Sequence, residues 1–186
     1  MHYFAIDYKA DMGLKKALEA IKGLAEEGLI KDYAICGGIA TFAWTETFLT
    51  RDLDVLVVLP EANKGTVALT SVYEYLKKRY DKWEGRWLII EGIPVDIFPA
   101  DDLGKFAIQD AKEIDYEGIK IKVLTPEYLI AFALKAGRPR DIAKIEMLLK
   151  QAPVDRDKLD KILTKYALKE KFTKKFGSLS WGMERS

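Results

Sequence analysis

Two glycines and two aspartates, close together in the chain, are the residues whose types and spacing could do chemistry. Gly37-Gly38 ends one apolar run, and the aspartates of Asp52-Leu53-Asp54 open the next one. Two acids placed two residues apart on a strand point to the same face, and paired carboxylates are hard oxygen ligands that can bind Mg²⁺. Backbone N–H groups at a glycine turn that leads into a helix can bind phosphate. The pattern therefore predicts a site for a metal ion and a nucleotide.

A third acid, Asp96, lies within the apolar stretch 94–98. Its side chain points away from those of its two apolar neighbours, because side chains on a strand alternate between the faces. If this strand lies beside the one that Asp52 and Asp54 open, three carboxylates face one pocket, where their repulsion is costly without a cation. Two Mg²⁺ ions roughly 3.5–4 Å apart would neutralise them and could stabilise the attacking and leaving oxygens of a phosphoryl-type displacement.

The composition is that of a globular chain. Of its 186 residues, 49% are hydrophobic and 32% are charged, which argues against disorder. No apolar run reaches the ~20 residues that span a bilayer, and the N-terminus lacks the segments of a signal peptide. The single cysteine excludes an internal disulfide and favours a cytoplasmic location. The single histidine argues against a histidine-based zinc site, so any metal is expected to bind to carboxylates.

Charge is distributed unevenly, although the net charge is only +1. Residues 1–134 contain 16 Lys/Arg and 22 Asp/Glu, a balance of −6, whereas residues 135–186 contain 14 and 7, a balance of +7. A solvated helical surface would account for the basic third, and so would a face that binds a polyanion such as a nucleotide or RNA. Asn and Gln are scarce while Lys and Glu are abundant, a composition that leans toward a thermophilic source.

Hydrophobic periodicity predicts an α+β (α/β) chain with a mixed sheet of about five strands. The helices that flank this sheet are expected at about 12–28, 38–48 and 66–80. The strands are expected at 33–36, 52–59, 87–90, 94–98 and 119–123, with a tight turn at 91–92. The last strand alternates apolar residues with lysines and is therefore expected at an edge of the sheet.

The C-terminal third is expected to form a small helical subdomain. Thr125-Pro126-Glu127 is typical of a helix start, and further helices are expected to begin at Asp141 and Asp155. The predicted division is a core over 1–124, a helical subdomain over 125–167 and a basic tail over 168–186, for which partial disorder is expected.

In combination, Gly37-Gly38, Asp52-Leu53-Asp54 and the later Asp96 resemble the signature of the polymerase-beta-like nucleotidyltransferase superfamily. That signature is an apolar residue, Gly, then Gly or Ser, a helix, two acids one residue apart, and a third acid on a later strand. Thr50-Arg51 and the segment 135–141 resemble the branch that includes the abortive-infection toxins of type IV toxin–antitoxin systems and their uncharacterised prokaryotic relatives. The resemblance covers roughly residues 30–150.

This resemblance implies a fold, an activity and a set of partners. The fold would be nucleotidyltransferase-like, and the enzyme would move a nucleoside monophosphate from a nucleoside triphosphate such as ATP to a hydroxyl, with Mg²⁺ or Mn²⁺ as cofactor. The acceptor would be RNA, a protein or a small molecule, and a toxin-type enzyme would have a cognate antitoxin as partner. No membrane partner is expected.

The resemblance also implies roles for individual residues. The three aspartates would bind the metal ions and act in catalysis, and the glycines would bind the triphosphate through their backbone amides. The residues implied in nucleotide binding are Gly37, Gly38, Thr50, Arg51, Lys135 and Arg138, with Asp141 as an accompanying acid, and those implied in metal binding are Asp52, Asp54 and Asp96.

Two departures from the family pattern leave other functions open. Gly38 stands where the superfamily often has Ser, and Lys144 stands where the toxin-like branch often has a further acid. A catalytically inactive module that binds a nucleotide or a partner on the same fold is therefore an alternative. A two-metal phosphodiesterase or nuclease is a third reading, although the glycine turn argues against it. Trp83 and Trp87 are interpreted as core or rim packing rather than as a base-stacking surface.

Overall fold

The structure is a computed structural model that describes residues 8–46, 50, 52–60, 66–80, 82–85 and 87–177. Its contacts divide the chain into two compact units, one ending at Thr125 and the other beginning at Pro126. None of the helices in these ranges has the length and apolarity that crossing a bilayer requires.

The first unit is a mixed sheet with helices on both faces. Its helices are α1 (Tyr8–Glu26), α2 (Gly37–Phe42), α3 (Thr66–Lys77) and α4 (Asp102–Gln109). Its strands are β1 (Asp32–Cys36), β2 (Leu53–Val58), β3 (Trp83–Glu84), β4 (Trp87–Ile90), β5 (Ile93–Pro99), β6 (Lys112–Tyr116) and β7 (Ile119–Val123).

The strand order is β3-β4-β5-β2-β1-β7-β6. The pairs β2–β5 and β1–β7 are parallel, and the other neighbouring pairs are antiparallel. The predicted mixed α/β fold is confirmed, and the seven-stranded sheet is larger than the predicted five because β3 and β6 were not expected.

The prediction that the strand 119–123 lies at an edge is wrong. β7 lies between β1 and β6, and β6 forms the edge instead. The lysines of β7 do mark a polar face, but each is matched by an acid: Lys120 pairs with Glu113 at 3.3 Å and Lys122 with Asp32 at 2.7 Å. Cross-strand ion pairs of this kind allow a charged face on an interior strand.

The hairpin of β4 and β5 closes as predicted, through Glu91 and Gly92. Both residues have positive φ, 49° and 87°, and Ile90 pairs directly with Ile93. Two successive positive φ values are the geometry of a type I′ turn, whose twist matches that of the strands it joins.

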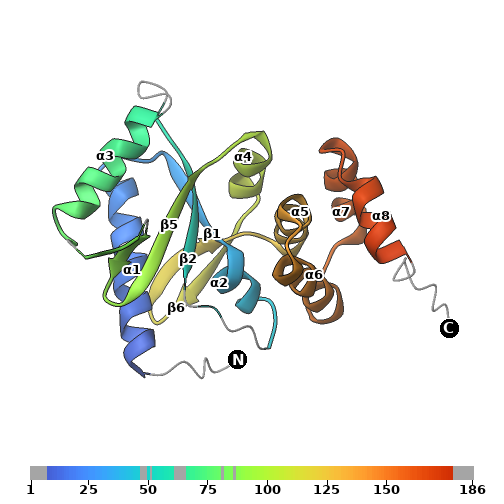
Figure 1. Cartoon of the computed structure of the whole chain (residues 1–186), viewed down its shortest axis with the longest axis horizontal. Helices are drawn as coiled ribbons and strands as arrows, with labels where there is room; N and C mark the ends of the chain where they lie inside the picture. Colours follow the sequence, from blue (N-terminus) through green and yellow to red (C-terminus); the bar gives the residue numbers. More distant parts are fainter. Residues whose placement is uncertain are drawn as a thin grey trace. The chain divides into compact units, whose positions relative to one another are not determined.

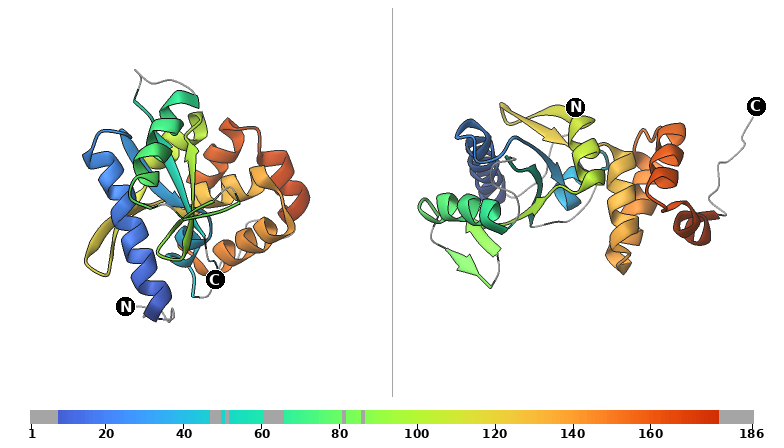
Figure 2. Two further views of the ribbon diagram at one scale, coloured as in Figure 1. Left: turned by 60° about the vertical axis from the view of Figure 1, so that its left-hand side comes forward. Right: turned by 90° about the horizontal axis from the view of Figure 1, so that it is seen from above.

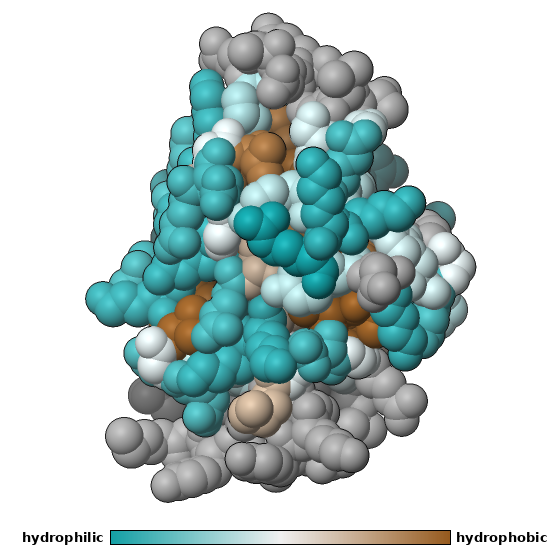
Figure 3. Space-filling view, turned by 90° about the vertical axis from the view of Figure 1, so that its left-hand side faces the viewer, coloured by the Kyte–Doolittle hydropathy of each residue, from teal (hydrophilic) through white to brown (hydrophobic). Residues whose placement is uncertain are grey.

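Two layers of helices enclose the sheet (Figure 1, Figure 2). α1 and α3 lie on one face, where Gly13 of α1 approaches Ile93 and the Tyr73 hydroxyl of α3 lies 3.4 Å from the Ile97 nitrogen. α2 and α4 lie on the other face, where Gly104 of α4 packs against Leu56. Seen from the side of α1 and α3, the surface is mostly hydrophilic, with hydrophobic residues in small separate areas (Figure 3).

The helix boundaries differ from the sequence-based ones mainly at α2. This helix begins directly at Gly37, and it ends at Phe42 rather than near residue 48. Residues 47–49, the end of the predicted helix, lie outside the described residues. α1 ends at Glu26, just before Gly28, which has a φ of +70°.

The second unit contains α5 (Pro126–Ala136), α6 (Pro139–Gln151), α7 (Arg156–Lys165) and α8 (Lys169–Phe176). The prediction that Asp141 is the N-cap of α6 is wrong, because the helix begins at Pro139 and Arg138 is the N-cap. No helix was predicted over α8, where Phe172 and Phe176 are buried and their ring centroids lie 5.2 Å apart. Residues 178–186 of the predicted tail lie outside the described residues.

A buried carboxylate joins two helices of this unit. Glu127, in the first turn of α5, is 3% exposed. It accepts a hydrogen bond of 2.8 Å from the Asp155 backbone N–H and lies 3.1 Å from the Lys158 ammonium. The start of α7 is therefore attached to the start of α5.

Candidate functional site

The glycine turn lies at the junction of β1 and α2, directly against an acid. Gly37 has a φ of +62°, a left-handed conformation that L side chains rarely adopt. A Cβ at this position would also overlap the Asp54 carboxylate and lie only 2.7 Å from its Cγ atom. The position therefore requires glycine twice, once for the backbone and once for the space that Asp54 occupies.

The second glycine makes room for the segment that precedes β2. A Cβ on Gly38 would overlap the Thr50 side chain, lying 2.5 Å from its Cβ atom. The Thr50 hydroxyl donates a short hydrogen bond to the Asp52 carboxylate. On the other side of the turn, the Thr41 hydroxyl donates to the Gly37 carbonyl at 2.8 Å. Thr50 and Asp52 are thereby held next to the start of α2.

The acids of β2 and β5 lie side by side. These strands run parallel, and Asp54 pairs in register with Asp96. Paired residues on neighbouring strands share a face, and the strands are about 4.8 Å apart. Both side chains are half-buried, on the face that α2 and α4 cover. β5 lies between β4 and β2, so Asp96 is on an interior strand.

The three predicted metal ligands are not equivalent. Asp54 and Asp96 are direct neighbours, whereas the Asp52 carboxylate accepts the hydrogen bond from Thr50. Among the described residues, no three Asp, Glu, His or Cys side chains gather as a group that could hold a metal ion. Two adjacent carboxylates still provide the hard oxygen donors that Mg²⁺ prefers, and a cation between them would relieve their repulsion.

One of the predicted nucleotide-binding residues of the second unit, Arg138, caps α6 together with the accompanying acid Asp141. Asp141 is 2% exposed and accepts hydrogen bonds from the Arg138 backbone N–H at 3.2 Å and from its Nε at 2.7 Å. Burial raises the pKa of Asp141, but the hydrogen bonds from Arg138 and the charges of Arg138 and Lys144 outweigh it, so that the pKa is lowered.

Two predicted nucleotide-binding residues remain, Lys135 and Arg51. Lys135 lies in the last turn of α5, and Arg51 lies outside the described residues. The described structure therefore places Gly37 against Asp54 and Gly38 against Thr50. It also joins Thr50 to Asp52 by a hydrogen bond and sets Asp54 beside Asp96 in the sheet.

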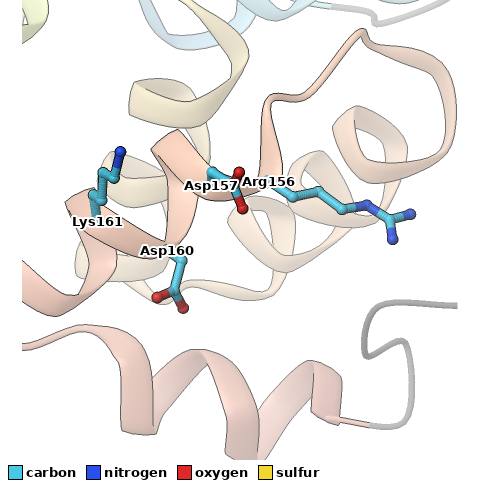
Figure 4. A pocket seen from close by; sticks show the side chains of 4 residues that line it. All are labelled: Arg156, Asp157, Asp160 and Lys161. Carbon is cyan, nitrogen blue, oxygen red and sulfur yellow. The ribbon is translucent and has the colours of Figure 1, made fainter. Parts of the chain in front are cut away.

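Two surface cavities lie away from these residues. One, of about 340 Å³, is lined by four charged residues of α7, of which Asp160 points toward α8 (Figure 4), where it pairs with Lys169 at 2.8 Å. The other, of about 450 Å³, lies between α3 and β3 and is lined in part by Tyr73 and Trp83. The first cavity is lined by charged residues at the start of α7. The second lies on the sheet face opposite to Asp54 and Asp96.

We call the sheet face that carries Asp54 and Asp96 the acidic face. Two aromatic residues on this face were missed as functional candidates. Trp87 and Phe98 are each 39% exposed. The hairpin register, once the turn at Glu91 and Gly92 is recognised, places Trp87 on the same face as Asp96. Counting outward from that turn would have found this from the sequence.

Comparison with solved structures identifies the fold. A nucleotidyltransferase-like antigenic protein from Paracoccidioides brasiliensis aligns with a TM-score of 0.54 at 18% identity, covering 89% of this chain and 93% of that one. The antibiotic-resistance factor ANT(2″)-Ia aligns in its solution structure with a TM-score of 0.52 at 16% identity, covering 94% of this chain and 100% of that one.

A crystal structure of ANT(2″)-Ia in complex with adenylyl-2″-tobramycin aligns with a TM-score of 0.51 at 15% identity, covering 86% of this chain and 98% of that one. No family model matches the sequence, and no curated protein does. At these identities the likenesses show a shared nucleotidyltransferase-like fold.

Proposed function

We propose that this chain is a metal-dependent nucleotidyltransferase, which transfers a nucleoside monophosphate from a nucleoside triphosphate to an acceptor hydroxyl. The observation that carries the proposal is the position of Asp54, which lies beside Asp96 on the sheet and against Gly37 at the turn. A divalent-ion site next to a phosphate-binding turn is what such a reaction needs. The nucleotidyltransferase-like fold supports the same class of reaction.

Different residues of the chain would bind the metal ion, the triphosphate and the acceptor. Asp54 and Asp96 would hold Mg²⁺ or Mn²⁺, with Asp52 as the third carboxylate, and the backbone amides of Gly37 and Gly38 would face the triphosphate. The bound metal would lower the pKa of the acceptor hydroxyl and neutralise the leaving pyrophosphate. Asp96 lies on the side away from the glycine turn and would orient the acceptor, so that its oxygen replaces pyrophosphate on the α-phosphorus.

Residues other than the three acids and the two glycines would supply further contacts to the nucleotide. Thr50, Arg51 and Lys135 remain candidates for them, as does Arg138, whose guanidinium already holds Asp141. RNA, a protein or a small molecule is the proposed acceptor class, and a toxin-type enzyme with a cognate antitoxin is the proposed biological setting. The single cysteine supports a cytoplasmic enzyme, and the scarcity of Asn and Gln supports a thermophilic source.

The test is transfer of label from each nucleoside triphosphate, with Mg²⁺ or Mn²⁺, to total RNA or lysate. Asp54→Asn should lower transfer at least about a hundredfold, the scale of losing one preorganised electrostatic contact, and leave the fold intact. Asp32→Asn is the matched control, because Asp32 is an aspartate of the neighbouring strand β1 whose partner is Lys122. Full turnover by Asp54→Asn with every active nucleotide would refute the metal assignment.

One observation favours a second candidate, a binding module without turnover. The described residues contain no group of three metal ligands, and the Asp52 carboxylate is engaged by Thr50. Such a module should bind a nucleotide in calorimetry with little dependence on Mg²⁺ or Mn²⁺ and should release no pyrophosphate. Metal-dependent release of pyrophosphate would exclude it.

A further inference from the structure

Trp87 lies directly beside Asp96 on the acidic face of the sheet. β4 and β5 are antiparallel, and Leu88 pairs with Val95. The next position outward in this register places Trp87 opposite Asp96, on the face away from Leu88 and Val95. Strand spacing puts the two side chains about 5 Å apart at their Cβ atoms.

A second aromatic residue follows on the same face. Phe98 is two residues beyond Asp96 on β5, about 7 Å along the strand. Asp96 therefore has an aromatic neighbour across the sheet and another along its own strand. Both residues are 39% exposed, although large aromatic side chains gain most from burial. Aromatic residues are enriched in binding surfaces, and these two lie next to a candidate active site.

On this basis we propose that Trp87 and Phe98 hold the acceptor by stacking against a nucleobase carried on the same sugar as the reacting hydroxyl. The inference rests on the proposed function and names its acceptor class as a nucleoside, either free or at the end of an RNA strand. A ribose hydroxyl and its base lie within one nucleotide, which suits an acid and an aromatic ring on adjacent strands. Bases stack on aromatic side chains irrespective of sequence.

The location of Asp54 supports the assignment of Trp87 and Phe98 to the acceptor rather than to the triphosphate. Asp54 lies on the strand between Asp96 and the glycine turn, so the triphosphate and the aromatic pair are on opposite sides of the two acids. The stacked ring would therefore belong to the acceptor and not to the triphosphate. Removing either aromatic side chain should weaken acceptor binding and leave triphosphate binding unchanged.

The same hairpin provides a matched control. Trp83 on β3 is 36% exposed, nearly the same as Trp87. It pairs with Leu88 and so lies on the opposite face of the sheet, where its ring centroid is 5.9 Å from that of Tyr73. Trp83→Ala removes an equally large and equally exposed ring without touching the acidic face.

The first measurement is equilibrium binding of a fluorescent single-stranded RNA oligonucleotide and of free adenosine to the full chain, without triphosphate. Trp87→Ala should weaken binding roughly 5- to 150-fold, the range measured for loss of one base–aromatic stack. Trp87→Phe should retain most of the affinity, and Trp83→Ala should bind as the wild type does. A preference for the oligonucleotide over adenosine identifies an RNA end, and equal binding identifies a free nucleoside; either result supports stacking.

The second measurement is the acceptor KM in the transfer reaction, which Trp87→Ala should raise while the KM for the triphosphate stays the same. The inference is overturned if neither probe binds the wild type, if Trp87→Ala binds as tightly as the wild type, or if Trp83→Ala loses as much. It is also overturned if the only labelled product in lysate is a protein. Asp54→Asn should abolish transfer but keep oligonucleotide binding, so failure of the proposed function and failure of the stacking surface give different results.

Discussion

Replacing Gly37 by alanine is the sharpest test of the site's geometry. The new Cβ would lie 2.7 Å from the Asp54 Cγ and 2.9 Å from its Cβ. A rotation about χ1 could move the carboxylate away, but it cannot move the Asp54 Cβ, which is fixed to the backbone of β2. The substitution must therefore shift either the turn or the strand that carries the acid.

The expected cost has two parts. A left-handed conformation costs an alanine about 1–2 kcal/mol, and overpacking in a closed site typically adds about 1–3 kcal/mol. Gly28→Ala is a control for the first part alone, because Gly28 has a similar φ of +70° with nothing within 4 Å of the added Cβ. For a chain of this length 1 kcal/mol changes Tm by about 2–4 °C.

Thermal unfolding followed by circular dichroism would measure the difference. Gly28→Ala should lower Tm by about 2–4 °C if the left-handed conformation costs ~1 kcal/mol, and Gly37→Ala by about 6–12 °C if overpacking raises the total cost to ~3 kcal/mol. Transfer activity should be lost in Gly37→Ala and kept in Gly28→Ala, since only the first displaces Asp54. Equal Tm values for the two variants, with activity in both, would refute the close approach of Asp54 to the turn.

Two further predictions concern the second unit. The pKa of Asp141 is lowered in the folded chain. The stability that its charged form provides should therefore be complete above the unfolded pKa and should disappear as the pH falls through the lower folded pKa. In urea unfolding, the difference in free energy of unfolding between wild type and Asp141→Asn should shrink below about pH 4. A difference that grows toward low pH would contradict this sign. Glu127→Ala should cost about 1–3 kcal/mol, because it removes a buried carboxylate that accepts a hydrogen bond from the Asp155 N–H and pairs with Lys158. The exposed Glu146→Ala should stay within about 0.5 kcal/mol.

The parts of the fold that were predictable are those with a strong local pattern. The strand around Asp96 and the Glu91-Gly92 turn were recognised because apolar runs flanked a turn signal. β3 was missed because two residues, Trp83 and Glu84, are too few to show a period. β6 was missed because its five residues are mostly charged, and only the pairing with β7 shows that they form a strand.

The site was predictable in its residue types but not in its neighbours. The spacing of Asp52 and Asp54 and the isolated Asp96 pointed to a group of acids, but the parallel pairing of β2 and β5 is a long-range feature that no local pattern shows. The hydrogen bond from Thr50, which gives Asp52 a different environment from Asp54, also depends on the path of the chain around Gly38. Trp87 was judged from its local sequence as packing, although counting outward from the Glu91-Gly92 turn places it next to Asp96.

The length of the turn at Glu91 and Gly92 sets the register between β4 and β5. Adding or deleting one residue there would shift the pairing of β4 with β5 by one position. If β5 kept its register with β2, Asp96 would then lose Trp87 as its neighbour; if β5 moved instead, Asp96 would turn into the apolar layer beneath α1 and α3 and an apolar side chain would take its place. Either way the chain could still form a hairpin of the same length, so descendants of this sequence could vary the identity of the turn residues far more freely than their number.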